Sequence, residues 1–364
     1  MQTLGSAFAT RGHNDQNNFL ILRLVAASLV VYGHTLGMGG SCNGCFEFVA
    51  GWLHYRYSGD LGVHMFFTIS GFLVFASFDR SRDLVQFAKA RALRIYPALL
   101  VCVLLMVFVV GPLATTMSHH EYFASPQITH YLFSNATLYQ AVAELPGVFL
   151  TNKMPNIVNG PLWTLPIESR FYMYVALLGV FGLTAGRKVA SAGIVGLLLL
   201  GMFAPNVLPT VGEDPTYHRL GWFFAAGALL YANRDSVPLD WKVLALVVLF
   251  AVVSYGTSTF DFAAGLVVIY AVFWFAFAPK IPLPRFVQDY SYGIYLYGWP
   301  IAQFIDDKHP NIGGYKLTAI TMALSWIAGA ISWFAIERPC LEFKKTRRAR
   351  KTLTTTNSGR QNLV

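Results

Sequence analysis

Two ionisable side chains share one apolar stretch near the start of the chain, RLVAASLVVYGH at residues 23–34. Arg23 and His34 are eleven residues apart, which in an α-helix is about three turns and about 16 Å along the axis. Both side chains therefore lie on one face, and that face is suited to line a path with a cation at one end and a titratable ring at the other. Two structural alternatives stay open: Arg23 reaching to lipid headgroups, and His34 as a packing histidine.

A second cationic pair stands in KARALRIYP, where Arg91 and Arg94 are three residues apart on one helical face just before Pro97. Guanidinium groups bind oxyanions through two parallel donors, so this pair is suited to phosphate groups. The alternative is that both side chains only anchor a helix end at the membrane surface.

A carboxylate lies in GPLWTLPIESRFYMY, where Glu168 follows Trp163 by one to two helical turns. A charged group inside a bilayer costs a few kcal/mol or more and needs a partner. Arg170 and the histidines of the first two apolar segments are the available partners, and a structural ion pair is the alternative. Glu168 and Arg170 are two residues apart and point to different helical faces, which disfavours a simple local pair.

The stretch GDLGVHMFFTISGF carries Asp60 and His64 at the depth expected for His34. His64 is equally suited to packing and to contact with a substrate. Ser70 and Gly71 are small, and small residues let a neighbouring helix approach closely. We therefore assign these two to helix packing.

The elements that must position these side chains are membrane helices. The chain has 364 residues, of which 55% are hydrophobic and only 12% charged, whereas about a quarter of a soluble domain is charged. This composition predicts an all-α, polytopic membrane helix bundle. About ten transmembrane helices are expected, at residues 19–38, 61–78, 95–113, 162–184, 189–204, 219–232, 241–256, 262–278, 289–305 and 316–336.

Lysine and arginine gather on one side of these spans, which predicts that both termini are cytoplasmic and that the number of spans is even. Residues 1–18 are expected to be a cytoplasmic tail that precedes an uncleaved first span. Residues 19–340 would form the membrane domain, and 341–364 a basic, disordered cytoplasmic tail held near anionic lipid. The net charge of +9 is concentrated there, so nucleic-acid binding is not expected.

The longest loop, at about 114–160, is predicted to lie outside, where a bulky ligand could be held. It carries a glycosylation sequon at Asn135, which matters only in a host that glycosylates. In another loop, Cys42 and Cys45 are a disulfide, a redox pair or two ordinary thiols. No second cysteine pair completes a metal site, so no metal is expected.

The order of these motifs resembles that of the acyltransferase family 3 membrane proteins, over about residues 19–340. Each motif is weak alone, and five in the family's order are specific. They are Arg23-x10-His34, GVHMFFTISGF, Arg91-x-x-Arg94 before Pro97, WTLPIESRFY, and SYGIYLYGWP at 291–300. One departure is Gly298, where many members have histidine. Some members also carry an esterase-like domain, and none is expected here.

The resemblance implies an O-acyltransferase of the bacterial inner membrane. Its members move an acyl group, usually acetyl, from cytoplasmic acyl-CoA to a hydroxyl of an extracytoplasmic glycan. O-antigen, exopolysaccharide or lipo-oligosaccharide is the expected acceptor. Acetyl-CoA, the glycan and the lipid bilayer are therefore the expected partners, and the oligomeric state is not addressed by the sequence.

The resemblance also implies roles for the residues above. His34 would take a proton from the attacking hydroxyl and Glu168 would orient its ring or stabilise the imidazolium, although an acyl-histidine intermediate is equally compatible. The three arginines of the motifs would bind the CoA phosphates, and three further side chains would contact the acceptor. These sets are Arg23, Arg91 and Arg94 for CoA, and His64, Trp163 and Arg170 for the acceptor.

The alternative function is a polytopic transporter or exporter of a glycan or small metabolite, because buried arginine, histidine and glutamate also build proton relays. Transporters often show repeated halves and helices broken at mid-membrane. Neither is evident in this sequence. A non-catalytic scaffold would leave the buried polar residues unexplained.

Overall fold

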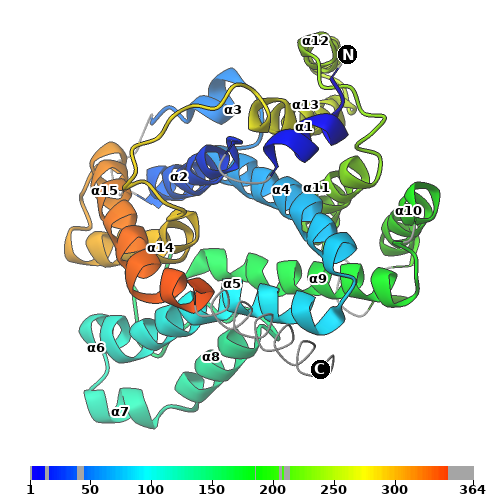
Figure 1. Cartoon of the computed structure of the whole chain (residues 1–364). Coiled ribbons are helices and arrows are strands. Elements are labelled where there is room, and N and C mark those ends of the chain that lie inside the picture. The colour runs from blue at the N-terminus through cyan, green and yellow to red at the C-terminus, as the bar shows by residue number, and fades with distance from the viewer. Residues whose placement is uncertain are drawn as a thin grey trace, which may run out of the picture.

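The computed structural model describes residues 2–12, 16–38, 45–184, 186–204, 207–208 and 214–342. Within these residues the chain is a bundle of α-helices without a β-sheet (Figure 1). Its longer helices are α2 (Phe19–Met38), α4 (Ser58–Ser81), α5 (Leu84–Leu105), α9 (Thr164–Val180), α10 (Arg187–Phe203), α11 (Pro215–Ala232), α12 (Trp241–Val253), α13 (Phe260–Ala276), α14 (Ser291–Lys308) and α15 (Gly314–Ser332). The short elements are α1 (Leu4–Arg11), α3 (Phe48–Trp52), α6 (Gly111–Ala114), α7 (His119–Ala124), α8 (Pro126–Thr137) and the single turns η1 (Met106–Val110), η2 (Gly160–Trp163) and η4 (Trp333–Glu337).

Each of the ten predicted spans coincides with one of the longer helices, and the all-α polytopic fold is confirmed. Four described helices are long and apolar enough to cross a membrane: Phe19–Met38, Ser58–Ser81, Leu84–Ala114 and Gly314–Glu342. The others are shorter, so the exact number of spans remains a prediction. The sixth helix, expected to be short, extends over Pro215–Ala232.

Helix α4 lies inside the bundle and packs closely on α11 and α2 (Figure 1). Its contact with α11 depends on two glycines. A Cβ atom at Gly71 would lie 1.9 Å from the carbonyl oxygen of Phe224, and one at Gly227 would lie 2.1 Å from that of Thr68. Only glycine permits this approach of two backbones, as the sequence predicted for Gly71.

The N-terminal residues form a docked helix, which differs from the tail expected over 1–18. In α1, Leu4 and Ala7 are buried, and the ring of Phe8 packs edge-on against Phe72 at 5.2 Å. A capping box at Thr3 fixes the start of α1. The basic tail expected at 341–364 lies outside the described residues from 343 onwards, and so does Cys42.

The segment at 114–160 is folded onto the bundle. The Tyr122 hydroxyl donates to the carbonyl oxygen of Val107 at 3.0 Å, which ties α7 to η1. The Asn135 side chain is 3% exposed and donates to the carbonyl oxygens of Tyr131 and Val142 at 2.9 Å. The sequon asparagine is therefore enclosed and engaged, and cannot accept a glycan in this fold.

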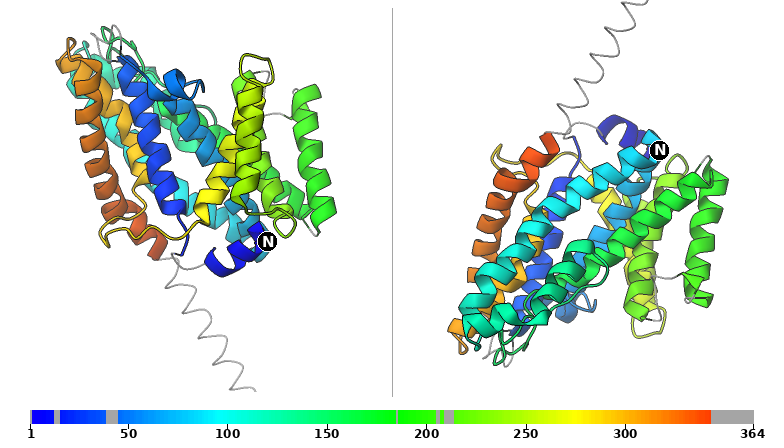
Figure 2. Two further views of the ribbon diagram at one scale, coloured as in Figure 1. Left: turned by 90° about the horizontal axis from the view of Figure 1, so that it is seen from above. Right: turned by 90° about the horizontal axis from the view of Figure 1, so that it is seen from below.

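The end of the same segment is attached to α14. The Trp299 indole N–H donates to the carbonyl oxygen of Ile157 at 3.0 Å, and the Gln303 amide donates to those of Met154 and Ile157 at 2.7 Å. Figure 2 shows the helices running side by side, with α10 at the rim of the bundle. The segment thus covers the end of α14 that lies beside His34.

Candidate active site

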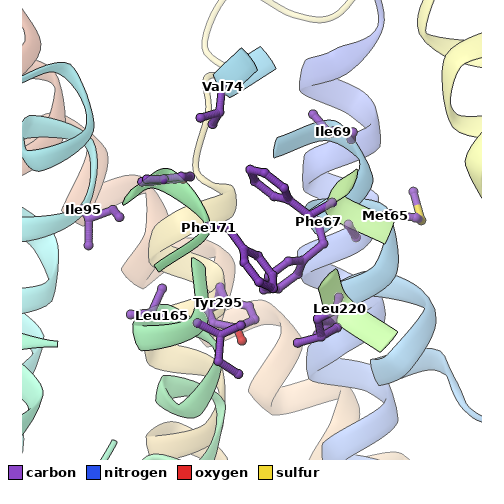
Figure 3. Packing of buried hydrophobic residues seen from close by; sticks show 14 of the residues in the cluster. Met65, Phe67, Ile69, Val74, Ile95, Leu165, Phe171, Leu220 and Tyr295 are labelled. Carbon is purple, nitrogen blue, oxygen red and sulfur yellow. The ribbon is translucent and has the colours of Figure 1, made fainter. Parts of the chain in front are cut away.

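A cavity with an empty volume of about 850 Å³ lies among α2, α4, α5, α9 and α14. Its lining on α4 runs from Val63 to Val74, which corresponds to about 16 Å along the helix axis. Much of the wall is apolar, and Figure 3 shows Phe67, Leu165 and Tyr295 among the packed side chains that form it. The cavity is therefore elongated, as a binding site for a long ligand requires.

Four of the predicted site residues line this one cavity: Arg23, Arg91, Arg94 and Glu168. Arg23 comes from α2, the arginine pair from α5 and the carboxylate from α9. The structure thus brings together the proposed donor site and one of the two proposed catalytic groups. We refer to the part of the bundle with the three arginines as the arginine end, and to the opposite part, with His34, as the histidine end.

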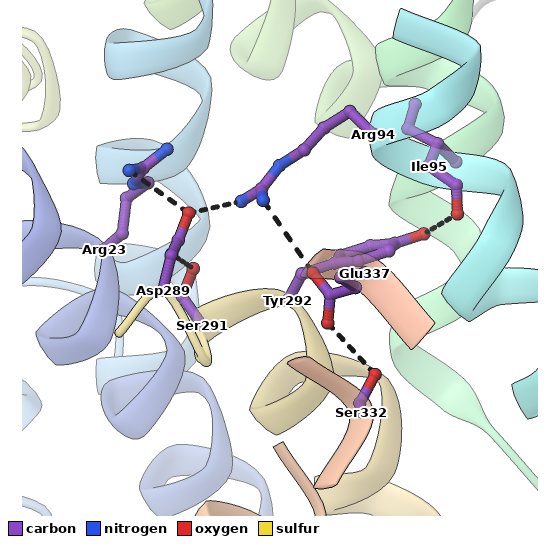
Figure 4. A network of polar contacts seen from close by, with 8 residues as sticks. All are labelled: Arg23, Arg94, Ile95, Asp289, Ser291, Tyr292, Ser332 and Glu337. Carbon is purple, nitrogen blue, oxygen red and sulfur yellow. Dashed lines mark hydrogen bonds and ion pairs between the residues drawn. The ribbon is translucent and has the colours of Figure 1, made fainter. Parts of the chain in front are cut away.

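Two carboxylates that the sequence analysis did not name form ion pairs with Arg23 and Arg94 (Figure 4). Asp289 lies 3.2 Å from Arg23 and 2.7 Å from Arg94. Glu337, which is 3% exposed, lies 3.8 Å from the other terminal nitrogen of Arg94. The Ser291 hydroxyl donates to Asp289 at 2.6 Å, so the central carboxylate is fixed on both of its oxygens.

Asp289 lies in the loop before α14, which begins at Ser291, two residues after the start of the span predicted at 289–305. Burial alone would raise the pKa of its carboxyl, but the adjacent guanidiniums of Arg23 and Arg94 hold the pKa well below its usual value. Asp289 is therefore ionised at neutral pH, and its charge is shared between two cations. The charges of Arg23 and Arg94 are correspondingly offset by protein carboxylates.

Arg91 differs from the other two arginines. Among the described residues it makes no ion pair or hydrogen bond, and its guanidinium lies over the ring of Tyr172, 5.8 Å from the centroid. The buried Nε atoms of Arg91 and Arg23 have no hydrogen-bond partner in the described part of the chain. Unpaired buried donors are costly, so this end of the cavity fits an anionic group such as a phosphate.

Glu168 is held by hydroxyl groups and not by the partners that the sequence suggested. Ser70 donates to its Oε1 atom at 2.8 Å, and the hydroxyl of Tyr172 donates to the same oxygen. Arg170 points elsewhere and donates to the carbonyl oxygen of Tyr139 at 2.9 Å. Ser70, which the sequence analysis assigned to helix packing, is thus a hydrogen-bond donor to the carboxylate. The Oε2 atom of Glu168 accepts no hydrogen bond from the described residues.

His34 lies at the histidine end and does not line the cavity. Its half-buried ring packs edge-on against Trp299, with centroids 4.9 Å apart, and at 5.9 Å from Tyr57. At that end the cavity is lined by Thr164 and Tyr295, whose hydroxyl groups are 2.6 Å apart. The path expected to join Arg23 to His34 is therefore not continuous in this structure, because the cavity ends before the imidazole. No described contact joins His34 to Glu168.

The residues proposed to contact the acceptor lie outside this cavity. His64 is 2% exposed, its Nδ1 atom lies 2.5 Å from the Tyr55 hydroxyl, and its ring stacks on Phe223 at 4.1 Å. The structure thus places His64 in the core, in favour of the packing alternative. Trp163 stacks on Tyr217 at 6.0 Å, so its ring face is occupied by a tyrosine of α11.

Replacing Asp289 by asparagine is expected to lower the free energy of unfolding by about 1–3 kcal/mol, because two largely buried guanidiniums lose their counter-charge. This loss is smaller than for a fully buried ion pair, because the side chains of Arg23 and Arg94 are 27% and 24% exposed. Thermal unfolding of the detergent-solubilised protein measures the effect. The control is Asp261→Asn, which breaks an exposed pair with Arg56; equal losses in both variants would contradict a special role for Asp289.

The chain is similar to known proteins over most of its length. A family model described as "Acyltransferase domain" matches residues 17–336, a range that includes every residue predicted for the site. The chain is 28% identical over 335 residues to "O-acetyl transferase" of Shigella phage Sf6, covering 89% of this chain and 96% of that protein. It is also 28% identical over 379 residues to "Nodulation protein 10" of Rhizobium leguminosarum bv. viciae, covering 93% and 96%. No solved structure matches significantly.

Proposed function

The chain belongs to the acyltransferase family 3 membrane proteins, and on this premise we propose that it O-acetylates an extracytoplasmic glycan. The donor is acetyl-CoA at the cytoplasmic side of the bacterial inner membrane. The name of the phage relative, "O-acetyl transferase", supports the acetyl group and the oxygen acceptor. The observation that carries the proposal is one cavity lined both by Glu168 and by Arg91, whose guanidinium makes no ion pair with a described residue.

The arginine end is the proposed donor site and faces the cytoplasm, as do both termini. Arg91 binds a CoA phosphate directly, since no described carboxylate competes for its guanidinium. Arg23 and Arg94 both form ion pairs with Asp289. They therefore add positive potential to the donor site and define its shape, but their charges are partly offset. The narrow apolar remainder of the cavity accommodates the pantetheine arm.

The proposed reaction is attack of a sugar hydroxyl on the thioester carbonyl carbon. A new C–O bond forms, the C–S bond breaks, CoA leaves as its thiolate, and the hydroxyl proton passes to a protein base. Glu168 is one such base, because hydroxyl donors hold one of its carboxylate oxygens and no hydrogen bond among the described residues occupies the other. Ser70 and Tyr172 fix its position.

His34 is the proposed base at the acceptor side. It lies at the histidine end beside the rings of Trp299 and Tyr57, and flat aromatic rings of this kind suit the faces of sugars. Because Glu168 does not contact His34, the Thr164–Tyr295 layer would have to open, so that the acyl group can reach the acceptor and the single proton taken up by His34 can pass on to Glu168. An acyl-histidine intermediate fits the same placement.

Arg91→Ala is expected to weaken acetyl-CoA binding by about 1.5–3 kcal/mol, roughly 10- to 100-fold, the value of hydrogen bonds to a charged group. Titration calorimetry with the purified protein measures the dissociation constant. Lys89→Ala is the matched control, because it removes the same charge from an exposed position of α5 outside the cavity. An unchanged affinity of Arg91→Ala for acetyl-CoA would show that the donor site is not at the arginine end.

A further inference from the structure

A second cavity lies between α9, α10 and α11, with an empty volume of about 1010 Å³. Its wall is apolar apart from a few groups, which include His218 and Arg219 near the start of α11. It is separate from the proposed active site. The Phe67 ring, which lines the active-site cavity, packs edge-on at 5.8 Å against Phe171, which lines the second one.

The position of α10 makes this cavity a groove at the rim of the bundle. In Figures 1 and 2 α10 stands at the periphery, and its closest packing is with α11. Ile194, Leu197 and Gly201 form the α10 side of the groove. A groove at the rim of a membrane bundle is in contact with lipid, so its natural occupant is a hydrocarbon chain.

Small residues keep the groove open. Gly221, Ala225 and Ala228 line it from α11 and Gly201 from α10. A Cβ atom at Gly201 would have only Leu208 nearby, at 3.6 Å, so a larger side chain there would occupy the groove itself. Gly196, five residues earlier on the same helix, does not line the groove and has open space around it.

The length of the groove corresponds to one leaflet. Its α11 lining runs from His218 to Ala228, ten residues or about 15 Å. This equals half of a hydrocarbon core that is about 30 Å thick. A single acyl chain of one leaflet therefore fits the groove with its headgroup beside Arg219.

Arg219 supplies a cation where that headgroup would lie. Its guanidinium makes no hydrogen bond within the described residues; its nearest carboxylate is Asp60, at 3.9 Å. Its buried NH1 atom is without a hydrogen-bond partner among the residues described. The neighbouring Arg56 and Asp261 pair at 2.8 Å, so of these two described arginines Arg219 has the looser ion pair.

We propose that this groove binds one anionic phospholipid of the outer leaflet, with an acyl chain between α10 and α11 and its phosphate on Arg219. The lipid fills the space between α10 and the rest of the bundle. A phosphate oxygen beside the guanidinium supplies the acceptors that the protein lacks there. This binding is independent of the acyl-transfer reaction.

The test measures lipid retained by the purified protein. Wild type and variants are reconstituted in vesicles of equal parts phosphatidylglycerol and phosphatidylcholine, extracted again in mild detergent, and analysed for bound phospholipid by mass spectrometry. Wild type and Gly196→Leu are expected to retain one phospholipid, preferentially phosphatidylglycerol. Gly201→Leu is expected to retain several-fold less, because leucine fills the groove.

The headgroup contact is tested with Arg219→Gln, with Arg56→Gln as a control of equal charge. Arg219→Gln is expected to lose the preference for phosphatidylglycerol by about fivefold, the effect of one cation near anionic lipid, while Arg56→Gln keeps it. Equal lipid retention by Gly201→Leu and Gly196→Leu overturns the groove as the site. An unchanged preference in Arg219→Gln overturns the phosphate contact, even if Gly201→Leu fails to fold.

Discussion

Replacement of Glu168 by glutamine is expected to slow acyl transfer by roughly 10²- to 10⁴-fold, the usual contribution of a general base. Glutamine has nearly the same shape and can still accept hydrogen bonds from Ser70 and Tyr172. It is neutral and cannot take up a proton. The variant is therefore expected to insert and fold normally, and to bind acetyl-CoA as the wild type does.

The measurement is release of CoA from acetyl-CoA by membranes that contain the variant, together with acetylation of the surface glycan. Glu144→Gln is the matched control, because Glu144 is an exposed carboxylate in the loop before α9 and does not line the cavity. If Glu168→Gln releases CoA and acetylates the glycan at the wild-type rate, the carboxylate is a structural hydrogen-bond acceptor and not a base.

His34→Ala is expected to reduce glycan acetylation by a similar factor, roughly 10²- to 10⁴-fold, with acetyl-CoA affinity unchanged. The reason is its position, since His34 lies at the histidine end and away from the cavity that would bind CoA. The loss should therefore appear in the transfer rate and not in the dissociation constant of acetyl-CoA.

His130→Ala is the control for this second prediction, because His130 is exposed on α8 and does not line the cavity. Rates of acetylation and acetyl-CoA dissociation constants are measured for both variants in the same membrane preparation. Full acetylation by His34→Ala would show that His34 only packs against its neighbours, the alternative named in the sequence analysis. Weakened acetyl-CoA binding would instead place the imidazole in the donor site.

The helices were predictable because apolar runs and their breaks are local in the sequence. The approach of Arg23 to Arg94 in one cavity was also predictable in outline, since the sequence placed both at the cytoplasmic end of their predicted spans. Their carboxylate partners were not. Asp289 is 195 residues from Arg94 along the chain, and hydropathy alone does not specify which helices are neighbours.

The pairing of Glu168 with Ser70 was missed for a related reason. Sequence position gives the depth of a side chain in the membrane through the rise of the helix. It does not give the rotation of that helix relative to its neighbours. Glu168 was placed one to two turns from Trp163, and the family resemblance assigned it to the His34 ring. In the structure the Glu168 carboxylate faces α4 and accepts a hydrogen bond from Ser70, which is 98 residues away along the chain.

The sequence analysis also gave no helix at the position of α1. Its polar composition favoured a tail, but Leu4, Ala7 and Phe8 are spaced three to four residues apart and form one apolar face. The Thr3 and Ser6 side chains complete a capping box at its start. A capping signal of this kind is local, and it is the feature of the first residues that would have predicted the helix.

The central claim is that one polypeptide transfers an acetyl group from CoA at the arginine end to a hydroxyl at the histidine end. The direct test supplies radiolabelled acetyl-CoA to the cytoplasmic side of membrane vesicles from cells with and without the gene. We expect label in the glycan and stoichiometric release of CoA only when the protein is present, and neither with His34→Ala or Glu168→Gln. Glycan that reaches the vesicle lumen unlabelled, with no CoA released, would contradict the account and indicate an exporter.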